Sequence, residues 1–479
     1  MPKKLSLAVL ILLLAASGVS LAQTLQQLVN QPPNGAGIGF LLTDGTVMFQ
    51  GNSCLDWWKL TPDNKGSYVK GTWSQLASLP SNYAPLYFAS AVLADGRLVV
   101  EGGEYSNCGG NFTLTNQGAI YDPKTNQWTT LGHPKGWSYT GESPSVVLPN
   151  GKYLVGRKLD KTAATLDPAT LQWTLVPTPG KSDFNAEEGW TLMPDGSVLT
   201  FDVKNAPHSE RYVSSTQKWV SAGSTIVDLH SPHQGGCIPY GGGCYHAPGE
   251  VGPGVLRPNG TVLATGSGSN GGSGPGHTAV YDIASGKWTV GPDFPNGDNA
   301  GDSFAVLLPN GNVLVLGNSG ALYDFDGTNL TVDPVRGVAP ILVLPTGQVL
   351  AEGNGVAVYN PIGKHQSSWA PVITAFPHTV ARGSSYKISG RQFNGLSQAA
   401  AFGDEDESAT NYPLVRITNK ASHHVFYAKT HDHSTMAVAT GSATVSTKFD
   451  VPAGMETGAS TLEVVANGIP SKRVSITVN

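Results

Sequence analysis

The chain has 479 residues, of which 40% are apolar and only 13% are charged, and its net charge is -5. The 59 glycines and 33 prolines disfavour long helices and suit short strands joined by turns. The weak negative charge gives no reason to expect nucleic acid or an anionic membrane as partner.

Residues 1–22 predict a signal peptide. Lys3 and Lys4 precede the apolar stretch LAVLILLLAA, and Ser20-Leu21-Ala22 forms a small-residue cleavage site. An uncleaved anchor is the alternative interpretation. Because no later segment approaches the roughly 20 apolar residues of a membrane helix, we expect a secreted protein, extracellular or periplasmic, without a membrane span after cleavage.

One unit recurs along residues 23–371: an apolar strand, a turn that ends in Gly, and a second apolar strand. The turns are Asp44-Gly45, Asp95-Gly96, Asn150-Gly151, Asp195-Gly196, Asn259-Gly260, Asn310-Gly311 and Thr346-Gly347. Asn-Gly and Asp-Gly favour type I′ hairpins, in which both central residues have positive φ. A third strand and a strand containing Trp often follow, as in GAIYDPKTNQWTTL.

Four strands per unit and seven units predict an all-β fold with a seven-bladed kelch-type β-propeller. A solenoid is the competing architecture, but a closed ring also protects the sheet edges. Either the segment TLQQLVNQ or the stretch around Trp369 completes the last blade. From residue 372 to 479 the alternating strands predict one immunoglobulin-like, early-set β-sandwich.

The four cysteines predict disulfides if the chain is exported. Cys237 and Cys244 lie in one Gly-rich loop and form the expected local pair. Cys54 and Cys108 hold similar places in successive repeats, so they can pair if those repeats are neighbours. Free thiols are the alternative.

This architecture resembles galactose oxidase and the glyoxal-oxidase-like copper radical enzymes, over the whole mature chain. The resemblance implies a copper ion at the propeller centre, held by two Tyr and two His, with one Tyr cross-linked to a Cys. It also implies that the last His comes from the C-terminal domain, on a loop that reaches into the central channel.

The sequence supplies only part of this copper ligand set. Tyr87 in LYFASAVLADGR corresponds to the radical tyrosine, and His431 in YAKTHDHSTM corresponds to the last ligand. Ala36 stands where the cross-linking Cys is expected, and Gly301-Asp302 stands where a Tyr-His pair is expected. We therefore do not expect copper with a Tyr-Cys radical, and Tyr87 and His431 become candidate catalytic residues of a different site.

Carboxylates recur where the first strand of a blade begins. Eight residues before each turn lie Ala36, Tyr87, Glu142, Glu187, Val251, Asp302 and Val338. A propeller brings these positions together around the mouth of its channel. Like charges at that distance raise one another's pKa, so the ring is solvated, protonated or occupied by a cation.

A divalent cation, either Ca²⁺ or a transition metal, is one occupant that this ring can hold. The candidate metal ligands are Glu142, Glu187, Asp302 and His431. The structural alternative is that the carboxylates accept backbone N–H groups and tie the blades together, or that they pair with Arg157 or Arg336.

Two loops add further candidates. The insertion HSPHQGGCIPYGGGCYHAPGE, residues 230–250, favours a lid or a carbohydrate-contact loop, because tyrosine can stack against sugars. Its candidate ligand-binding residues are Tyr240, Tyr245, His246 and Glu250. The acidic stretch FGDEDESATNYP, residues 402–413, lacks the spacing of a calcium loop and favours a solvated surface loop.

Together these features predict a secreted, monomeric, galactose oxidase-like propeller protein without the full copper-radical site. We expect it to bind a glycan or another extracellular or cell-envelope ligand at the channel mouth, with or without a divalent cation. The alternatives are an oxidoreductase with a rebuilt metal centre that acts on alcohols, aldehydes or sugars, and a true copper radical oxidase.

Overall fold

The computed structural model describes residues 23–231, 238–240, 243–245, 249–270, 273–336, 341–401 and 405–479. The predicted signal peptide, Cys237 and His246 lie outside these residues, and so do the side chains of Tyr240, Cys244 and Tyr245. Within the described part, the chain is built from strands and two 3₁₀ turns, η1 (Pro295–Gly297) and η2 (Ser367–Trp369). No helix there is long and apolar enough to cross a membrane.

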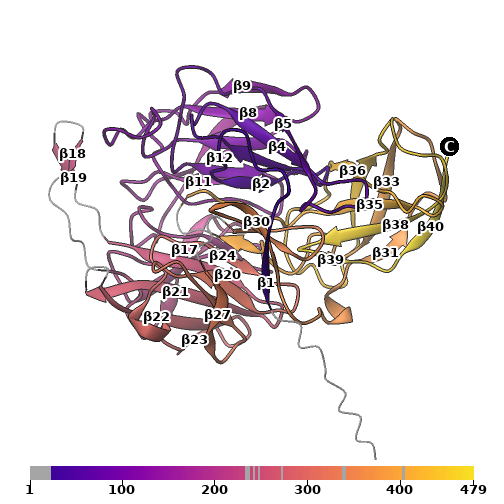
Figure 1. Cartoon of the computed structure of the whole chain (residues 1–479). Helices are drawn as coiled ribbons and strands as arrows, with labels where there is room; N and C mark the ends of the chain where they lie inside the picture. Colours follow the sequence, from indigo (N-terminus) through magenta and orange to yellow (C-terminus); the bar gives the residue numbers. More distant parts are fainter. Residues whose placement is uncertain are drawn as a thin grey trace, which may run out of the picture.

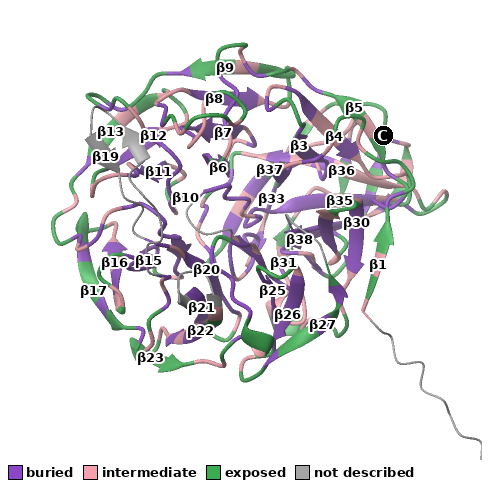
Figure 2. Cartoon of the chain, turned by 60° about the vertical axis from the view of Figure 1, so that its left-hand side comes forward, coloured by how far each residue is buried: buried purple, intermediate pink, exposed green. Residues whose placement is uncertain are grey.

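Seven antiparallel sheets are arranged radially as the blades of a propeller (Figures 1 and 2). Blades 1 and 2 contain β2 (Gly39–Leu41), β3 (Val47–Gln50), β4 (Trp57–Thr61), β5 (Thr72–Gln75), β6 (Ala89–Val92), β7 (Leu98–Glu101), β8 (Gly118–Asp122) and β9 (Gln127–Leu131). Blades 3 and 4 contain β10 (Ser145–Val147), β11 (Tyr153–Gly156), β12 (Ala163–Asp167), β13 (Gln172–Val176), β14 (Thr191–Leu192), β15 (Val198–Phe201), β16 (His208–Val213) and β17 (Lys218–Ser224).

The later blades follow the same order. Blades 5 and 6 contain β20 (Val251–Leu256), β21 (Thr261–Asn270), β22 (Ser273–Asp282), β23 (Lys287–Val290), β24 (Ala305–Leu307), β25 (Val313–Leu316), β26 (Ala321–Phe325) and β27 (Leu330–Arg336). Blade 7 contains β28 (Ile341–Val343), β29 (Val349–Gly353), β30 (Gly355–Asn360) and β1 (Thr24–Gln27). A separate hairpin before blade 5 pairs β18 (Ile238–Tyr240) with β19 (Gly243–Tyr245).

The ring is closed by β1, which pairs with β30 from Thr24↔Asn360 to Gln27↔Ala357. This result decides between the two closing segments that the sequence left open. Trp369 instead packs against the turn at Gly311. A strand from the start of the described chain therefore completes the last blade.

Tryptophans of the fourth strands connect neighbouring blades. Trp128 lies opposite Tyr121 in the β8–β9 register, and their rings are 5.2 Å apart. The indole N–H of Trp128 donates to the Ala77 carbonyl, which lies just after blade 1, at 2.9 Å. Trp288 repeats the pattern with Tyr281 and the Ala222 carbonyl of blade 4. Trp128 and Trp288 thus pack within their own blades and bond to the chain of the blade before or just after it.

The turns between first and second strands differ from the predicted type I′ geometry. At Asp44-Gly45, only the glycine has positive φ, at 74°. The Gly45 N–H donates to the Leu42 carbonyl, and the Asp44 carboxylate accepts the Thr46 N–H at 3.0 Å. This is a three-residue loop in which a type I turn ends in a left-handed glycine. The prediction of type I′ was wrong because the aspartate stabilises the turn through its side chain.

After blade 7 the chain enters a large curled sheet with its own apolar core, the yellow part of Figure 1. Its strands are β31 (Val372–Ala375), β32 (Thr379–Val380), β33 (Ser385–Arg391), β35 (Leu414–Asn419), β36 (Val425–His431), β37 (Val445–Asp450), β38 (Gly458–Ala466), β39 (Ile469–Pro470) and β40 (Val474–Val478). It contacts the face of the propeller that carries the hairpin turns, which we call the turn face. There the N–H groups of Thr430 and His433 donate to the carbonyls of Thr43 and Ala94.

Residues 394–401 and 405–413, which together we call the channel loop, insert among the innermost strands of the propeller. Its strand β34 (Ala400–Ala401) pairs with β24 of blade 6. The Gln398 amide oxygen accepts the Leu192 N–H of blade 4 at 2.7 Å, and the Asp406 N–H donates to the Phe88 carbonyl beside blade 2 at 2.8 Å. Bonds to blades on different sides of the ring place this loop in the central channel.

Candidate functional site

The positions that begin the innermost strands have an unusual backbone. Tyr87, Glu187 and Asp302 all adopt left-handed φ values, at 53°, 60° and 53°. Such a conformation costs a non-glycine residue roughly 1 kcal/mol or more, and it collects at functional sites. In blade 3 the preceding residue, Gly141, takes the positive φ of 78°. The same local bend thus recurs at the predicted ring positions, on the face opposite the turn face.

A lysine that the sequence interpretation did not include lies between two of the predicted acids. The Lys158 ammonium lies 2.7 Å from Oε1 of Glu187 and also contacts Oε1 of Glu142. All three side chains are buried, and that of Lys158 is only 1% exposed. The cation that the acidic ring required is therefore an amino group of the chain itself.

Two further acids complete the group. Glu104 follows β7, and its carboxylate bonds the side chain of Tyr105. Asp406 comes from the channel loop and is buried. We call the set Tyr87, Glu104, Glu142, Lys158, Glu187, Asp302 and Asp406 the acidic mouth. The set contains five carboxyl groups and one ammonium, so acidic groups outnumber the cation and the site is rich in hydrogen-bond acceptors.

Burial and mutual repulsion raise the pKa of three of these acids, Glu104, Asp302 and Asp406. The pKa of Asp302 rises to about 6, first because the channel wall surrounds it and then because Glu187 is near, although its side chain also reaches solvent. The pKa of Asp406 rises to about 7 through burial, with Asp302 adding to the effect. Both groups therefore titrate close to neutral pH and favour a proton, a cation or a hydrogen-bond donor beside them.

An aromatic side chain stands at the opening. Tyr87 is 43% exposed, and its ring lies edge-on to that of Tyr105 at 6.0 Å. Burial, followed by the charges of Asp406 and Asp302, raises the pKa of the Tyr87 hydroxyl, which stays protonated. The mouth thus offers an open aromatic face next to carboxylates.

His431 does not join this group. It ends β36, where its Nε2 lies 3.1 Å from Asp450 and its Nδ1 lies 3.3 Å from Asp432. Its neighbour Thr430 bonds the turn face. The innermost strand of blade 2 separates that face from Tyr87 by about seven residues, or roughly 20 Å. The four predicted metal ligands therefore do not come together, because β36 packs across the turns and the channel loop takes the central position.

Residues 402–413 were expected to form a solvated surface segment, and for 405–413, the part that the structure describes, this expectation was wrong. Glu405, Asp406 and Glu407 are all buried. The hydroxyl of Ser90 in blade 2 donates to the Glu407 carbonyl, and the Tyr412 hydroxyl bonds the Leu41 carbonyl of blade 1. These charged residues are buried because the channel loop inserts between blades that are distant in the sequence, and no local sequence pattern indicates this.

The remaining predicted residues lie apart from these contacts. Glu250 precedes β20, and its backbone exchanges hydrogen bonds with Ser231. Arg157, a possible partner of the acids, instead bonds Asp160 at 3.0 Å and stacks over the ring of Tyr139. Arg336 is exposed at the end of β27. The predicted contacts of Tyr240, Tyr245 and His246 fall on side chains outside the described part.

The predicted disulfide between successive repeats is confirmed. Cys54 and Cys108 are bonded, with their Cα atoms 5.4 Å apart. Cys108 lies in the loop that follows β7, close to Tyr105 and Glu104. The bridge therefore ties blade 1 to the loop that supplies part of the acidic mouth.

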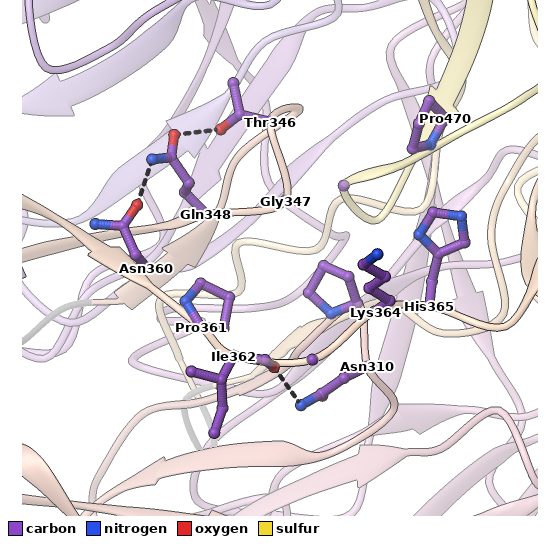
Figure 3. A pocket seen from close by; sticks show the side chains of 13 residues that line it. Asn310, Thr346, Gly347, Gln348, Asn360, Pro361, Ile362, Lys364, His365 and Pro470 are labelled. Atoms are coloured by element: carbon purple, nitrogen blue, oxygen red, sulfur yellow. Dashed lines mark hydrogen bonds between the residues drawn. The ribbon is translucent and has the colours of Figure 1, made fainter. Parts of the chain in front are cut away.

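A pocket of about 500 Å³ lies elsewhere, on the turn face between blades 6 and 7 and the β38–β39 connection (Figure 3). Its polar side chains bond one another, because Gln348 bridges Thr346 and Asn360 at 2.8 and 2.6 Å. Asn310 donates to the Ile362 carbonyl at 2.9 Å. Lys364 and His365 also line this pocket.

Comparisons with known proteins agree with this architecture. No family model matches the chain. A kelch-like protein of Aspergillus terreus, terF, is 30% identical over 92 residues, which is 19% of this chain and 19% of that protein. The chain thus spans about a fifth of the length of this curated relative.

Among solved structures, a fungal alcohol oxidase of the AA5 family, in complex with copper, aligns with 96% of this chain and 100% of its own. The TM-score is 0.51 and the sequence identity 14%. This likeness confirms the propeller fold that the sequence resemblance predicted. It concerns the fold alone, because identity at this level does not carry an activity.

The donors of the acidic mouth differ from those that the resemblance implies for copper. Two tyrosines and two histidines are expected there, whereas the acidic mouth contains one tyrosine, five carboxylates and an ammonium, and none of its members is a histidine. The Lys158 ammonium would also repel a metal ion placed beside Glu142 and Glu187. We therefore derive no step through copper.

Proposed function

We propose that this chain is an exported propeller protein that binds a glycan at the acidic mouth. The observation that carries the proposal is the partly exposed Tyr87 ring, whose hydroxyl lies within electrostatic reach of Asp406 and Asp302. A sugar ring can stack on the tyrosine while its hydroxyl groups donate to Asp302 and Glu104. The strained backbone at Tyr87 and Asp302 supports a ligand-binding role, because such strain collects where function requires it.

Export is supported by the N-terminal signal-peptide pattern and by the Cys54–Cys108 disulfide, which suits an oxidising compartment. The relevant glycans are then those of an extracellular medium or a cell envelope. The excess of carboxylates predicts a charge preference: amino sugars bind best, neutral sugars less well, and uronic acids worst.

A rebuilt metal centre is the weaker function. Lys158 already supplies positive charge to Glu142 and Glu187, and the imidazole of His431 lies on the other face. Binding in the proposed mode needs no metal ion, so chelation with EDTA should leave glycan affinity unchanged.

The test is calorimetric titration of the purified protein with chitosan, cello-, xylo- and galacturono-oligosaccharides. We expect measurable binding in the order given by charge, and a loss of about tenfold or more for Tyr87→Ala and for Asp302→Asn. Matched controls are Leu175→Ala, which removes an exposed apolar side chain from blade 3, and Asp293→Asn, which removes an exposed carboxylate. No binding by any oligosaccharide, or equal binding by Tyr87→Ala, would refute the proposal.

A further inference from the structure

Three residues of blade 4 form a Ser-His-Asp arrangement that the acidic mouth does not use. Oδ2 of Asp202 lies 2.7 Å from Nδ1 of His208, and Nε2 of His208 lies 3.0 Å from Oγ of Ser221. A base within hydrogen-bond reach of a hydroxyl, and itself oriented by a third group, is the geometry of an activated nucleophile.

The strand register of the blade explains this geometry. Asp202 directly follows β15, and its N–H donates to the His208 carbonyl at 2.9 Å, so the carboxylate lies beside the first residue of β16. Ser221 lies in β17 next to a bulge, where the register against β16 shifts between Ser209 and Glu210. The bulge turns the hydroxyl of Ser221 toward the imidazole.

The hydrogen bonds define the proton positions. The Asp202 carboxylate can only accept, so Nδ1 of His208 carries a proton and Nε2 is free to accept from Ser221. The Ser182 hydroxyl also donates to Oδ2 of Asp202, at 2.5 Å, which holds the carboxylate in place. The Gly223 N–H donates to Oγ of Ser221 at 3.1 Å and stabilises negative charge that develops on that oxygen.

The interior behind Asp202 is strongly acidic. A carboxylate oxygen of each of Glu188, Asp202 and Glu210 lies within 4.8 Å of the others, and all three residues are buried. The buried Lys181 ammonium pairs with Glu188 at 2.7 Å and Glu210 at 2.6 Å. Three carboxyl groups thus share one ammonium behind His208, and Asp202 is the one of the three that contacts the histidine ring.

The outer end of this arrangement is accessible. Ser221 is exposed, and the His208 side chain is 34% exposed. The strand that carries Ser221, β17, lies at the outer rim of the propeller (Figure 2). A small acyl group can approach the hydroxyl directly from solvent.

We propose that Ser221, His208 and Asp202 form a second site, which hydrolyses small esters by acyl transfer. Oγ of Ser221 attacks the ester carbonyl carbon while its proton moves to Nε2 of His208. The C–O bond to the alcohol breaks, and the alcohol leaves with that proton. Water then attacks the acyl-serine, gives its proton to His208, and releases the acid and the free Ser221 hydroxyl as the proton returns to Oγ.

The experiment treats the full protein with a fluorophosphonate probe and with p-nitrophenyl acetate. We expect one phosphonylated residue, with fluoride as the leaving group, and peptide mass mapping should place it at Ser221. Ser221→Ala should abolish labelling, and both Ser221→Ala and His208→Ala should reduce p-nitrophenol release about 100-fold.

The matched control is Ser224→Ala, which removes another exposed hydroxyl from the same strand and should change neither readout. Labelling that maps to another residue, or a wild-type protein that is not labelled, overturns the proposal. Mapping on the wild-type protein does not depend on how any variant folds. The result is also independent of glycan binding, because the two sites share no residue.

Discussion

The Lys158 ammonium lies 2.7 Å from Oε1 of Glu187, and both side chains are withdrawn from solvent. Lys158 follows the second strand of blade 3, whereas Glu187 precedes the first strand of blade 4, so the pair joins two blades at the channel. A buried pair of this kind contributes little net stability against an apolar replacement, but it is costly to break from one side. The contact therefore fixes the acidic mouth more than it stabilises the fold.

Removing the ammonium alone should destabilise the protein strongly. Lys158→Met leaves Glu142 and Glu187 buried without their cation, and we expect the free energy of unfolding to fall by about 3–5 kcal/mol. Lys135→Met, at an exposed lysine, should change it by less than about 0.5 kcal/mol. Urea unfolding measures both. Adding Glu142→Gln and Glu187→Gln to Lys158→Met should recover part of the loss, and an unaffected single variant would disprove the bridging role.

Asp406 should make stability depend on pH. Burial raises its pKa in the folded protein from 3.8 to about 7, so the folded state holds the proton more tightly than the unfolded state. The protonated carboxyl therefore contributes fully to stability below a pH of about 4, and this contribution is lost as the pH rises through about 7. As the pH rises from about 4 to about 8, the free energy of unfolding of Asp406→Asn should therefore increase relative to that of the wild type by about 1 kcal/mol or more.

Asp432→Asn is the control of opposite sign. The hydrogen bond from Lys448 lowers the pKa of Asp432, so its contribution is present at neutral pH and lost in acid. Relative to wild type, this variant should lose stability as pH rises. Parallel pH curves for wild type and Asp406→Asn would contradict the assignment of a buried, protonated carboxyl to Asp406.

The left-handed backbone at Asp302 can be tested with two small residues. At a φ of 53°, glycine is unstrained but alanine is not, so Asp302→Gly should be more stable than Asp302→Ala by about 1 kcal/mol. Asp293 has no positive φ, and there the glycine variant should not exceed the alanine variant. Thermal or urea unfolding of the four proteins gives the comparison. An equal pair at position 302 would show that the bend carries no strain.

The Cys54–Cys108 bridge should contribute to stability by restricting the unfolded chain. The two cysteines are 54 residues apart, and replacing both with alanine should cost about 2–4 kcal/mol. Dithiothreitol should lower the stability of the wild type by more than it lowers that of the double variant, which retains only Cys237 and Cys244. A wild type that unfolds identically in its reduced and oxidised forms would count against this contribution.

The sequence was sufficient to predict the propeller ring and part of the acidic mouth. The turn repeat identified seven blades, and counting back from the turns placed Tyr87, Glu142, Glu187 and Asp302 on one face, where the structure brings them together. These predictions succeeded because strand length and turn chemistry are local properties that repeat. Lys158 could have been found only from a weak signal. It is a lone lysine just after the second strand of its blade, and that strand ends on the same face of the propeller as the predicted acids.

Other features of the sites depend on long-range contacts, which a local sequence pattern does not predict. Asp406 reaches the channel because a loop of the C-terminal sheet inserts there, and an acidic stretch read alone resembles solvated surface. His431 was placed at the channel by family resemblance, whereas the structure bonds it to Asp450 and Asp432. The Ser-His-Asp arrangement of blade 4 joins Asp202, which directly follows β15, to His208 of β16 and Ser221 of β17, and the pairing of these strands brings the three together.

Ring closure by β1 has a consequence for biosynthesis. The paired residues Thr24 and Asn360, in the two strands that close the ring, are 336 positions apart in the sequence. Because synthesis proceeds from the N-terminus, β1 must stay unpaired until blade 7 has been synthesised. Pairing over such a separation is slow, and the exposed edge can meanwhile join a neighbouring molecule.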